Sequence, residues 1–470
     1  MKRYEQLADE MRAAIDAGTL RPGERLPSVR EARRARQLSP STVFAAYGLL
    51  ESQGLVEARP RSGYYVRARA RPAHPEPRAA TPTAGTLAVQ VSELVFEVLG
   101  HARQRGLVPL GSAFPSPALF PLPELARALG RATRRLDPWR TVEDLSPGSA
   151  ALRRQIAQRY LAGGLGVDPD EIVVTNGAME ALNLCLETVT RPGDLVAVES
   201  PTFYAALQAL ERLGLRAVEV ATDPRTGVDL ASLHEVLARH PVKACWFMPT
   251  FQNPLGSLMP EERKRELVEL LARHDIPLIE DDVYGELHFG ARRPPPAKAF
   301  DRRGLVMHCN SFSKSLAPGY RIGWAAAGRY AGEVARRKLM GSLAAAVPSQ
   351  EGLSEYLRQG GYERHLRQLR ATLALYQAAA LRAVGKHFPP GTRVTRPEGG
   401  YFLWLELPAG VDALQLHRLA LAHEISVAPG HLFSADRRHA SGLRLNCGHG
   451  DDMRCEQAIK TVGQIARSLV

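Results

Sequence analysis

The chain has 470 residues, of which 45% are hydrophobic and 23% charged, and a formal net charge of +12. It contains no apolar run long enough to cross a membrane, and its first residues lack the apolar stretch of a signal peptide. Five scattered cysteines, an odd number, are typical of reduced thiols in a cytoplasmic protein and show no metal-ligand spacing. The length leaves room for a small domain followed by a large two-layered one.

The first 71 residues form a basic segment with a helical pattern. Fourteen Lys and Arg against eight Asp and Glu give this segment a charge of +6, half of the total. A first helix is predicted to end at Gly18, because apolar residues recur at helical spacing before it. Those residues are Tyr4, Leu7, Met11 and Ile15. Ser28 is the expected N-cap of a second helix, and Ser39 is the expected cap of a third that has Pro40 in its first position.

A β-hairpin is expected after the third helix. The helix face predicted to pack inward comprises Val43, Ala46, Tyr47 and Leu50. Residues 54–66 then predict a hairpin that turns at 60–63 and has arginines at its tip. Three helices followed by a basic hairpin are typical of a winged helix-turn-helix. Its third helix enters the major groove of DNA, and its wing lies along phosphates or the minor groove.

Residues 1–70 resemble the N-terminal domain of GntR-type regulators. The matching elements are Gly23, Leu26-Pro27-Ser28, Arg30-Glu31, Ser41-Thr42-Val43 and Arg61-Ser62-Gly63-Tyr64. The DNA-contacting residues expected from this resemblance are Ser28, Arg30, Ser41, Thr42, Arg59, Arg61, Ser62 and Gly63. The alternative is that this segment is a basic helical cap without nucleic-acid function. Such a cap would not need the sequence motif, the basic charge and the wing to occur together.

Residues 71–90 are expected to be a linker. Four prolines between positions 72 and 82, with almost no large apolar side chain, predict a semi-extended segment rather than a fold. Its arginines would extend the contact with DNA or keep the segment soluble.

A lysine in the second half of the chain is surrounded by groups that suit an aldehyde and a phosphate. Lys314 follows the apolar run 305–310, lies among Ser311, Ser313 and Ser315, and precedes Arg321 by seven positions. A lysine amine forms a Schiff base with an aldehyde once its surroundings lower its pKa or supply a base. The hydroxyls and the arginine are the donors that a phosphate needs. An aldehyde and a phosphate on one small molecule describe pyridoxal 5′-phosphate.

Three further apolar runs, 172–174, 243–249 and 276–279, each precede a complementary group. Ligands collect at the carboxyl ends of strands in open α/β sheets. Asp281 would keep the pyridine nitrogen protonated, so that the ring withdraws electrons, and Asn253 and Tyr284 would contact the phenolic oxygen. Gly177 opens a helix whose first backbone N–H groups form a phosphate site. The alternative is that Lys314 is a solvated loop residue and that the other segments are ordinary turns.

Residues 105–470 resemble the fold-type-I aminotransferases. The resemblance implies that Lys314 is the Schiff-base lysine, that Asp281 binds the pyridine nitrogen and that Asn253 and Tyr284 contact the phenolic oxygen. It also implies a stacking role for Phe203 and a grip of Arg444 on the α-carboxylate of an amino acid. The residues expected around the phosphate are Gly177, Ala178, Met179, Ser311, Ser313 and Arg321. The alternatives are that Phe203 belongs to the core and Arg444 to the surface.

One position departs from that family. Its members often carry a tyrosine before the Gly-x-x-x-Leu-Arg element, and that tyrosine reaches across a dimer interface to the phosphate. The element here is Gly148–Arg153, and Glu143 occupies the expected tyrosine position. A carboxylate beside a phosphate is repulsive, so this contact is expected to be absent or the register to differ by a residue or two.

A winged helix followed by an aminotransferase-like domain resembles the MocR subgroup of GntR-type regulators over the whole chain. The expected domains are a winged helix at 1–70, the linker at 71–90 and an α/β pyridoxal phosphate domain at 91–470. That domain would have a large part at about 145–330 with a mixed, mostly parallel sheet. Its smaller α+β part would combine about 91–144 with 335–470. The resemblance implies a cytoplasmic transcription factor, usually a head-to-tail homodimer, that responds to pyridoxal phosphate or to an amino compound. One alternative is an aminotransferase that carries an accessory N-terminal module. Another is a DNA-binding protein whose cofactor domain has become a vestigial dimerisation scaffold.

Overall fold

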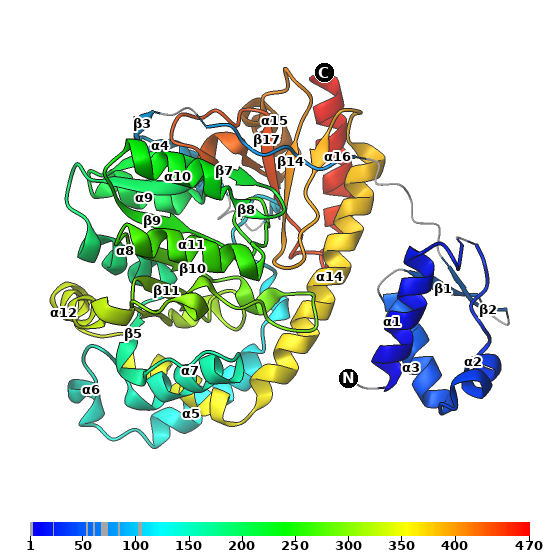
Figure 1. Cartoon of the computed structure of the whole chain (residues 1–470), viewed down its shortest axis with the longest axis horizontal. Coiled ribbons are helices and arrows are strands. Elements are labelled where there is room, and N and C mark those ends of the chain that lie inside the picture. Colours follow the sequence, from blue (N-terminus) through cyan, green and yellow to red (C-terminus); the bar gives the residue numbers. More distant parts are fainter. Residues whose placement is uncertain are drawn as a thin grey trace. The chain divides into compact units, whose positions relative to one another are not determined.

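Three helices and a β-hairpin make up the N-terminal unit, Met1–Ala73 (Figure 1). The structure is a computed structural model that describes residues 3–21, 23–52, 55–59, 62–66, 74–82, 85–101 and 106–470. The elements of this unit are α1 (Arg3–Asp16), α2 (Val29–Arg36), α3 (Pro40–Ser52), β1 (Val56–Arg59) and β2 (Gly63–Val66). The two strands pair antiparallel, with Val56 opposite Val66 and Arg59 opposite Gly63.

The predicted helix caps and inward face are present in this unit. Ser28 caps α2 in a capping box with Glu31, and the Ser39 hydroxyl accepts the N–H of Thr42 at the start of α3. The four residues of the predicted apolar face are fully buried, and they form one core with Leu7 of α1 and the strand residues Val56 and Val66. The winged helix-turn-helix predicted from the sequence is therefore confirmed.

The segment predicted to be a linker over 71–90 packs on the C-terminal unit from His74 onward. Val394 donates its N–H to the Pro75 carbonyl at 2.9 Å, and Arg396 donates to the His74 carbonyl at 2.6 Å. Strand β3 (Thr86–Ala88) extends the large sheet. The prediction of a linker was thus wrong for this part, because its carbonyl groups accept hydrogen bonds from the C-terminal unit and one of its few apolar side chains, Val89, packs in the core of the large sheet. Residues 67–73 and 83–84 lie outside the described ranges.

The C-terminal unit, His74–Val470, contains a nine-stranded sheet with the order β3-β7-β6-β9-β10-β11-β12-β5, and β8 pairs with β7. Its other strands are β5 (Ile172–Thr175), β6 (Leu195–Ser200), β7 (Arg216–Asp223), β8 (Gly227–Val228), β9 (Val242–Phe247), β10 (Leu278–Asp281), β11 (Val306–Ser311) and β12 (Gly323–Ala326). The adjacent strands from β7 through β11 run parallel, whereas β12 is antiparallel to both of its neighbours. This mixed, mostly parallel sheet confirms the predicted fold class.

Helices cover both faces of this sheet (Figure 1). One apolar core includes α8 (Ala178–Val189) and α9 (Tyr204–Arg212), and another includes α10 (Leu230–Arg239) and α11 (Glu261–Arg273). Successive residues of β9 belong to opposite cores, because side chains alternate between the faces of a strand: Cys245 and Phe247 belong to one and Trp246 to the other.

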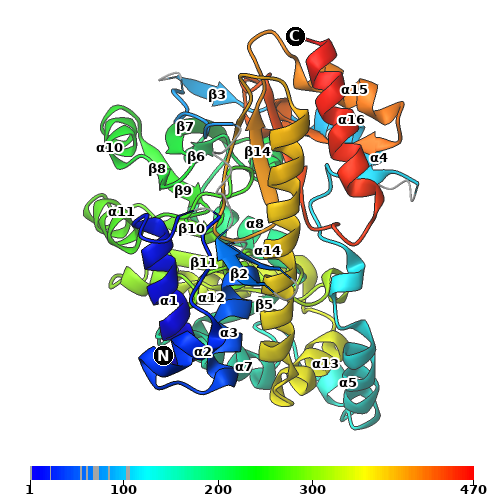
Figure 2. The ribbon, with the colours of Figure 1, turned by 90° about the vertical axis from the view of Figure 1, so that its right-hand side faces the viewer.

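The remaining elements frame the large sheet or build the smaller part. They are α4 (Ser92–His101), α5 (Leu122–Arg134), α6 (Arg140–Glu143), α7 (Ala150–Ala162), α12 (Ala331–Ser342), α13 (Val347–Arg358), α14 (Gly361–His387), α15 (Ala413–Leu421), α16 (Arg454–Ser468), β4 (Val108–Pro109), β13 (Arg393–Val394), β14 (Phe402–Glu406), β15 (Ile425–Ser426), β16 (Ala428–Pro429) and β17 (Gly442–Asn446). The small sheet has the order β13-β14-β17-β16. Figure 2 shows the long α14 beside this sheet and reaching toward α13.

Residues 91–144 do not join the smaller part as a block, contrary to expectation. Helix α4 packs in the core of the large sheet with α9, and α5 packs with α7, α13 and the strands β5 and β12. Val108 and Leu110 alone among the described residues of this segment enter the core of the small part. The sequence of an amphipathic helix shows which face is buried, but it does not identify the part of the protein that covers this face. The packing partners of α4 and α5 could therefore not be predicted from sequence.

Candidate functional site

Lys314 lies just beyond the carboxyl end of β11, as predicted. Its amine donates a hydrogen bond to the Ala113 carbonyl at 2.9 Å and lies 3.7 Å from the centre of the Phe114 ring. Burial lowers the pKa of Lys314 to about 7, with a further lowering by the positive charge of Arg444, while Asp281 opposes both. At neutral pH a large fraction of this amine is therefore unprotonated and nucleophilic.

Asp281 ends β10 and is buried. Its Oδ1 atom has no hydrogen-bond partner among the described residues. Burial raises the pKa of this carboxyl to about 7. A buried acceptor without a donor is costly, and a protonated pyridine nitrogen is a donor that would satisfy it. The orphaned oxygen thus fits the predicted contact between Asp281 and the pyridine ring of pyridoxal phosphate.

Asn253, Tyr284 and Arg444 form a connected buried chain. The Asn253 amide donates to the Tyr284 hydroxyl at 3.5 Å, and Arg444 donates to Asn253 Oδ1 at 2.9 Å. Burial raises the pKa of Tyr284, so its hydroxyl stays protonated at neutral pH. The two groups predicted to contact the phenolic oxygen are therefore brought together by the ends of different strands.

Arg444 is fully buried on β17, which rules out the surface alternative. Its guanidinium donates to the carbonyls of Gly111 at 2.8 Å and Ser112 at 3.3 Å, and its Nε atom has no partner among the described residues. No carboxylate of the described part of the chain pairs with it, and burial lowers its pKa. A buried guanidinium that has only neutral partners is a site suited to an incoming carboxylate.

The residues predicted around the phosphate converge between β5, α8 and β11. Gly177 is the N-cap of α8, and the Arg321 guanidinium lies so close that a Cβ on Gly177 would be 2.3 Å from its Nη2 atom. Arg321 donates to the Asn176 carbonyl at 3.0 Å and to the Ser313 hydroxyl at 3.5 Å. The Ser313 N–H donates to the Ser311 hydroxyl at 3.3 Å.

A helix start, two hydroxyls and an arginine together fit a phosphate group. Ala178 and Met179 form the first turn of α8, as predicted from the glycine turn before them. The close packing of this region also depends on Gly323 of β12, where a Cβ would lie 2.5 Å from the Gly177 carbonyl carbon.

Phe203 is the N-cap residue of α9, and its half-buried ring lies 4.9 Å from the ring of Tyr204. Its stacking on a cofactor ring stays a prediction. Tyr204, which sequence reasoning missed, has its ring centre 5.9 Å from the Arg444 guanidinium. Tyr401 was also missed, and its hydroxyl donates to the Ala113 carbonyl, the same acceptor that Lys314 uses. The aromatic residue next to Phe203 and the Gly399-Gly400-Tyr401 turn were the available signals.

Glu143, at the position where many aminotransferases have tyrosine, ends α6 with an exposed side chain. It carries no hydroxyl to offer a phosphate, so no phosphate contact is assigned to this position.

The predicted DNA-contacting residues that the structure describes lie on α2 and its N-cap, on α3 and in the hairpin. Arg30 is exposed on α2, and the hydroxyls of Ser41 and Thr42 contact the Ser39 hydroxyl at 2.9 and 2.8 Å in the first turn of α3. The Ser62 and Tyr65 hydroxyls are 2.6 Å apart, and Gly63 begins β2 with a φ of 108°. Ser28 uses its hydroxyl in the helix cap. Arg61 lies outside the described residues.

The wing also contains contacts that the sequence did not reveal. Arg59 forms an ion pair with Glu57 at 2.8 Å and lies over the Tyr65 ring at 4.3 Å. Arg25 lies against the wing, because a Cβ on Gly63 would be 3.0 Å from its Nε atom. Arg33 and Arg34 are exposed beside Arg30 on α2. The basic residues of α2 were visible in the sequence, but the approach of Arg25 to the wing was not.

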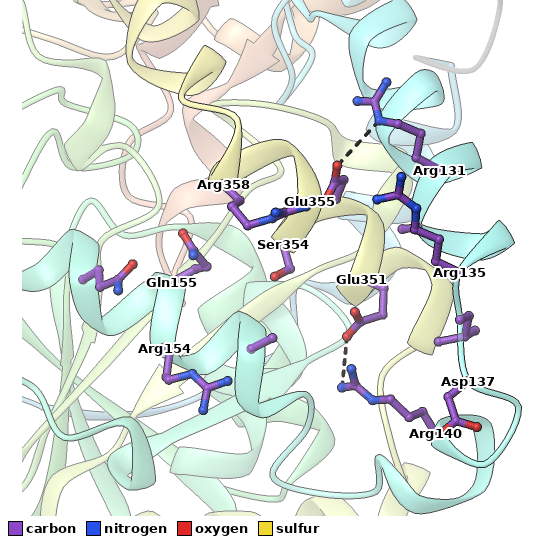
Figure 3. A pocket seen from close by; sticks show the side chains of 14 residues that line it. Arg131, Arg135, Asp137, Arg140, Arg154, Gln155, Glu351, Ser354, Glu355 and Arg358 are labelled. Carbon is purple, nitrogen blue, oxygen red and sulfur yellow. Dashed lines mark hydrogen bonds and ion pairs between the residues drawn. The ribbon is translucent and has the colours of Figure 1, made fainter.

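A separate cavity of about 440 Å³ opens at the surface between α5, α7 and α13 (Figure 3). Arg131 pairs with Glu355 at 3.5 Å and Arg140 with Glu351 at 3.1 Å across it. The cavity shares no lining residue with the Lys314 site.

None of the helices in the described ranges has both the length and the apolar character needed to span a bilayer.

Comparison with known proteins identifies both units. Residues 125–462 match the family model for aminotransferase class I and II, and residues 3–66 match the model for bacterial regulatory proteins of the gntR family. Together the fold and these matches define a helix-turn-helix protein with an aminotransferase-like domain. The chain belongs to the GntR-family helix-turn-helix transcriptional regulators of this two-domain kind, the architecture expected from the MocR resemblance.

The similar proteins fall into two groups. The uncharacterized HTH-type transcriptional regulator YdcR of Escherichia coli K12 is 46% identical over 99% of both chains. A structure of kynurenine aminotransferase from Pyrococcus horikoshii, in complex with PMP, has a TM-score of 0.73 and 30% identity over 80% of this chain and 94% of its own. The α-aminoadipate aminotransferase LysN of Thermus thermophilus, complexed with N-(5′-phosphopyridoxyl)-L-leucine, has a TM-score of 0.71 and 30% identity over 81% of this chain and 99% of its own.

Proposed function

We propose that this regulator binds promoter DNA through its winged helix and binds pyridoxal phosphate and an amino compound in its C-terminal unit. The observation that carries the proposal is the orphaned, buried Asp281 oxygen near an amine, Lys314, whose pKa is about 7. Neither feature stabilises the protein without a ligand, because the Asp281 oxygen lacks a hydrogen-bond donor and the Lys314 amine is buried away from water. Both suit a ligand that has a basic ring nitrogen and an aldehyde.

When bound, pyridoxal phosphate supplies an aldehyde and an electron-withdrawing ring. Asp281 would hold a proton on the ring nitrogen, while Asn253 and Tyr284 would orient the ring through its phenolic oxygen. Arg321, Ser311, Ser313 and the first N–H groups of α8 would hold the phosphate. Lys314 would supply the amine that anchors the cofactor.

The effector is proposed to be an amino acid. Arg444 is buried without a carboxylate partner among the described residues, and the rings of Phe402 and Phe433 lie 4.2 and 5.2 Å from its guanidinium. This low-dielectric setting strengthens a charge-assisted contact with an α-carboxylate. A ligand alters DNA binding only if it favours one conformation over another, so the amino acid must bind two states of the protein unequally.

The direct test is footprinting of the DNA upstream of neighbouring genes, with and without pyridoxal phosphate and amino acids. Protection that changes with these ligands supports the proposal. Protection by the protein that no such ligand alters removes the sensing half, and the absence of any protection removes the DNA-binding half.

Neutralising both wing arginines, Arg59→Ala with Arg61→Ala, is expected to weaken the salt dependence of DNA binding. Each arginine that contacts a phosphate releases roughly one counterion, so the slope of log K against log salt should flatten by about two. Fluorescence anisotropy at several salt concentrations measures this slope. Arg127→Ala, on the exposed face of α5, is the matched control and should leave the slope unchanged. An unchanged slope in the double variant would show that the wing does not contact phosphates.

A homodimer is proposed because an apolar patch lies exposed between α6 and α12. Its members are Trp139, Val142, Leu145, Met340 and Leu343, and they range from 42% to 81% exposed. The Ser146 N–H donates to the Leu343 carbonyl at 3.1 Å, which joins the two segments. Several exposed apolar side chains on two joined segments are suited to an interaction surface. Given its binding to DNA, the protein would act in the cytoplasm.

Met340→Asp with Leu343→Asp is expected to convert the protein from dimer to monomer, because two carboxylates would be desolvated at the interface. Sedimentation equilibrium should then give the 51.4 kDa mass of one chain instead of twice that value. Leu419→Asp, which changes an exposed apolar residue of α15, should remain a dimer. A dimer in the double variant would place the interface elsewhere.

Aminotransferase activity is the second candidate function, and the complete set of Lys314, Asp281, Tyr284 and Arg444 in one site favours it. Turnover of amino acid and oxoacid pairs at several per second, a common enzymatic rate, without protection of DNA would favour this function over regulation.

A further inference from the structure

Over its first two turns, from Ser41 to Gly48, the outward face of α3 is largely apolar rather than charged. The inward residues of this helix are buried, whereas Ser41, Phe44, Ala45 and Gly48 are exposed. Their spacing of three, four and seven places them on one helical face. None of these four side chains carries a charge or an amide group, and the hydroxyl of Ser41 is the one polar group among them. The nearest charged side chain on the same face is the exposed Glu51, two turns beyond Phe44, whose carboxylate accepts the Ala58 N–H at 2.8 Å.

Phe44 is 55% exposed, and it is the only large apolar side chain with strong exposure in the described part of the N-terminal unit. A single exposed apolar residue is common on a protein surface and by itself indicates nothing. The exposure of Phe44 is informative because of its position on α3. In a helix-turn-helix the second helix of the motif, α3 in this chain, lies in the major groove and presents its outward face to base edges.

Cationic side chains lie on the helix that precedes this apolar face. Arg30, Arg33 and Arg34 are exposed on the preceding helix, and none of them has an ion pair among the described residues. Hydroxyls of Ser39, Ser41 and Thr42 gather at the amino end of α3. Arginines and hydroxyls are typical phosphate ligands. The charge pattern therefore selects duplex DNA as the occupant, with phosphates at the border and base edges at the centre.

Base edges in the major groove differ in their donors and acceptors and in the 5-methyl group of thymine. Phe44 and Ala45 can neither donate nor accept a hydrogen bond through their side chains, so they cannot read the polar code. A phenyl ring and a methyl group do make favourable apolar contact with the thymine methyl. We propose that Phe44, supported by Ala45, is a specificity-determining residue that recognises thymine methyl groups in the operator.

This inference rests on the proposed binding of promoter DNA, and its test uses the protected DNA found by footprinting. Each thymine of that DNA is replaced in turn by deoxyuridine, which removes the methyl group and leaves every hydrogen-bonding atom in place. At one or two positions of each half-site, we expect the wild-type protein to bind roughly four- to tenfold more weakly, as burial of one methyl group predicts.

Phe44→Ala should weaken binding to the thymine-containing DNA by at least the same factor and should no longer respond to deoxyuridine at those positions. Phe44→Leu should keep the response, because it retains an apolar side chain. Since Phe44 is exposed, neither change should unfold the unit, and circular dichroism checks this.

Two results would overturn the inference while DNA binding itself stands. One is a wild-type protein that binds all deoxyuridine-substituted operators equally well. The other is a Phe44→Ala protein that keeps both the affinity and the deoxyuridine response of the wild type. Failure to bind any promoter DNA would instead refute the proposed function on which the inference depends.

Discussion

Lys314→Ala should yield a colourless protein that retains no covalently bound pyridoxal phosphate. The wild-type full chain, purified with the cofactor, is expected to be yellow and to hold the cofactor through a bond that borohydride makes permanent. Peptide mass mapping after reduction should locate the adduct on Lys314. The amine of this residue has a pKa of about 7 and lies near Asp281, the group proposed to hold the ring nitrogen.

Lys243→Ala is the matched control, because it removes an exposed lysine near the amino end of β9, away from the carboxyl ends of the strands, and this variant should stay yellow. An adduct on any lysine other than Lys314 would refute the assignment of the site. The protein without cofactor offers a further check through pH. Because the neutral amine reacts, the rate of cofactor capture should rise with pH through about 7 and then level off. A lysine with an ordinary pKa would still gain reactivity up to pH ~10.

Arg444→Lys should strongly weaken the response to amino acids while leaving much of the cofactor affinity. Lysine keeps the positive charge but loses the fork that binds a carboxylate at two points. The loss of one hydrogen bond to a charged group costs about 1.5–3 kcal/mol, which corresponds to a loss of roughly one to two decades in affinity. Titration of the bound cofactor's absorbance with an α-amino acid measures this loss, and footprinting shows whether the amino acid still affects DNA binding.

The matching ligand control is the amine that results when the same amino acid loses its carboxylate. Its binding should be the same in wild type and variant, because it does not use Arg444. If Arg444→Lys leaves the amino-acid response intact, the effector is an amine without a carboxylate or the cofactor alone is the signal. A modest loss of cofactor affinity is expected in any case, since Arg444 also donates to Asn253.

The predictable parts of the site each follow a local pattern in the chain. The glycine turn before α8 and the apolar runs that end before Asn253, Asp281 and Lys314 are local, and the structure places each of them at the end of its strand. Ser28 and Ser39 were predictable as caps for the same reason, since a cap depends on residues within one helical turn. The GntR and aminotransferase-like units were also confirmed.

Contacts between distant segments were not predictable in this way. Nothing near Arg444 in the sequence indicates that its guanidinium meets Asn253, 191 residues earlier, or the carbonyl groups of Gly111 and Ser112. The docking of His74 and Pro75 on the smaller part of the C-terminal unit was missed because it uses backbone carbonyls, which every residue carries. The pKa values of Lys314 and Asp281 also depend on neighbours from other strands.

The sequence by itself determined the two-unit architecture, the kinds of chemical group in the site and the strand that delivers each of them. Periodicity, capping residues and glycine turns act within a few residues, so they can be read in order along the chain. Only the tertiary structure decided which groups meet, that Arg444 is buried without a carboxylate partner in the described part of the chain, and that Phe44 faces outward from α3. Burial and electrostatic environment are set by residues far apart in sequence, because packing, rather than local propensity, brings them together.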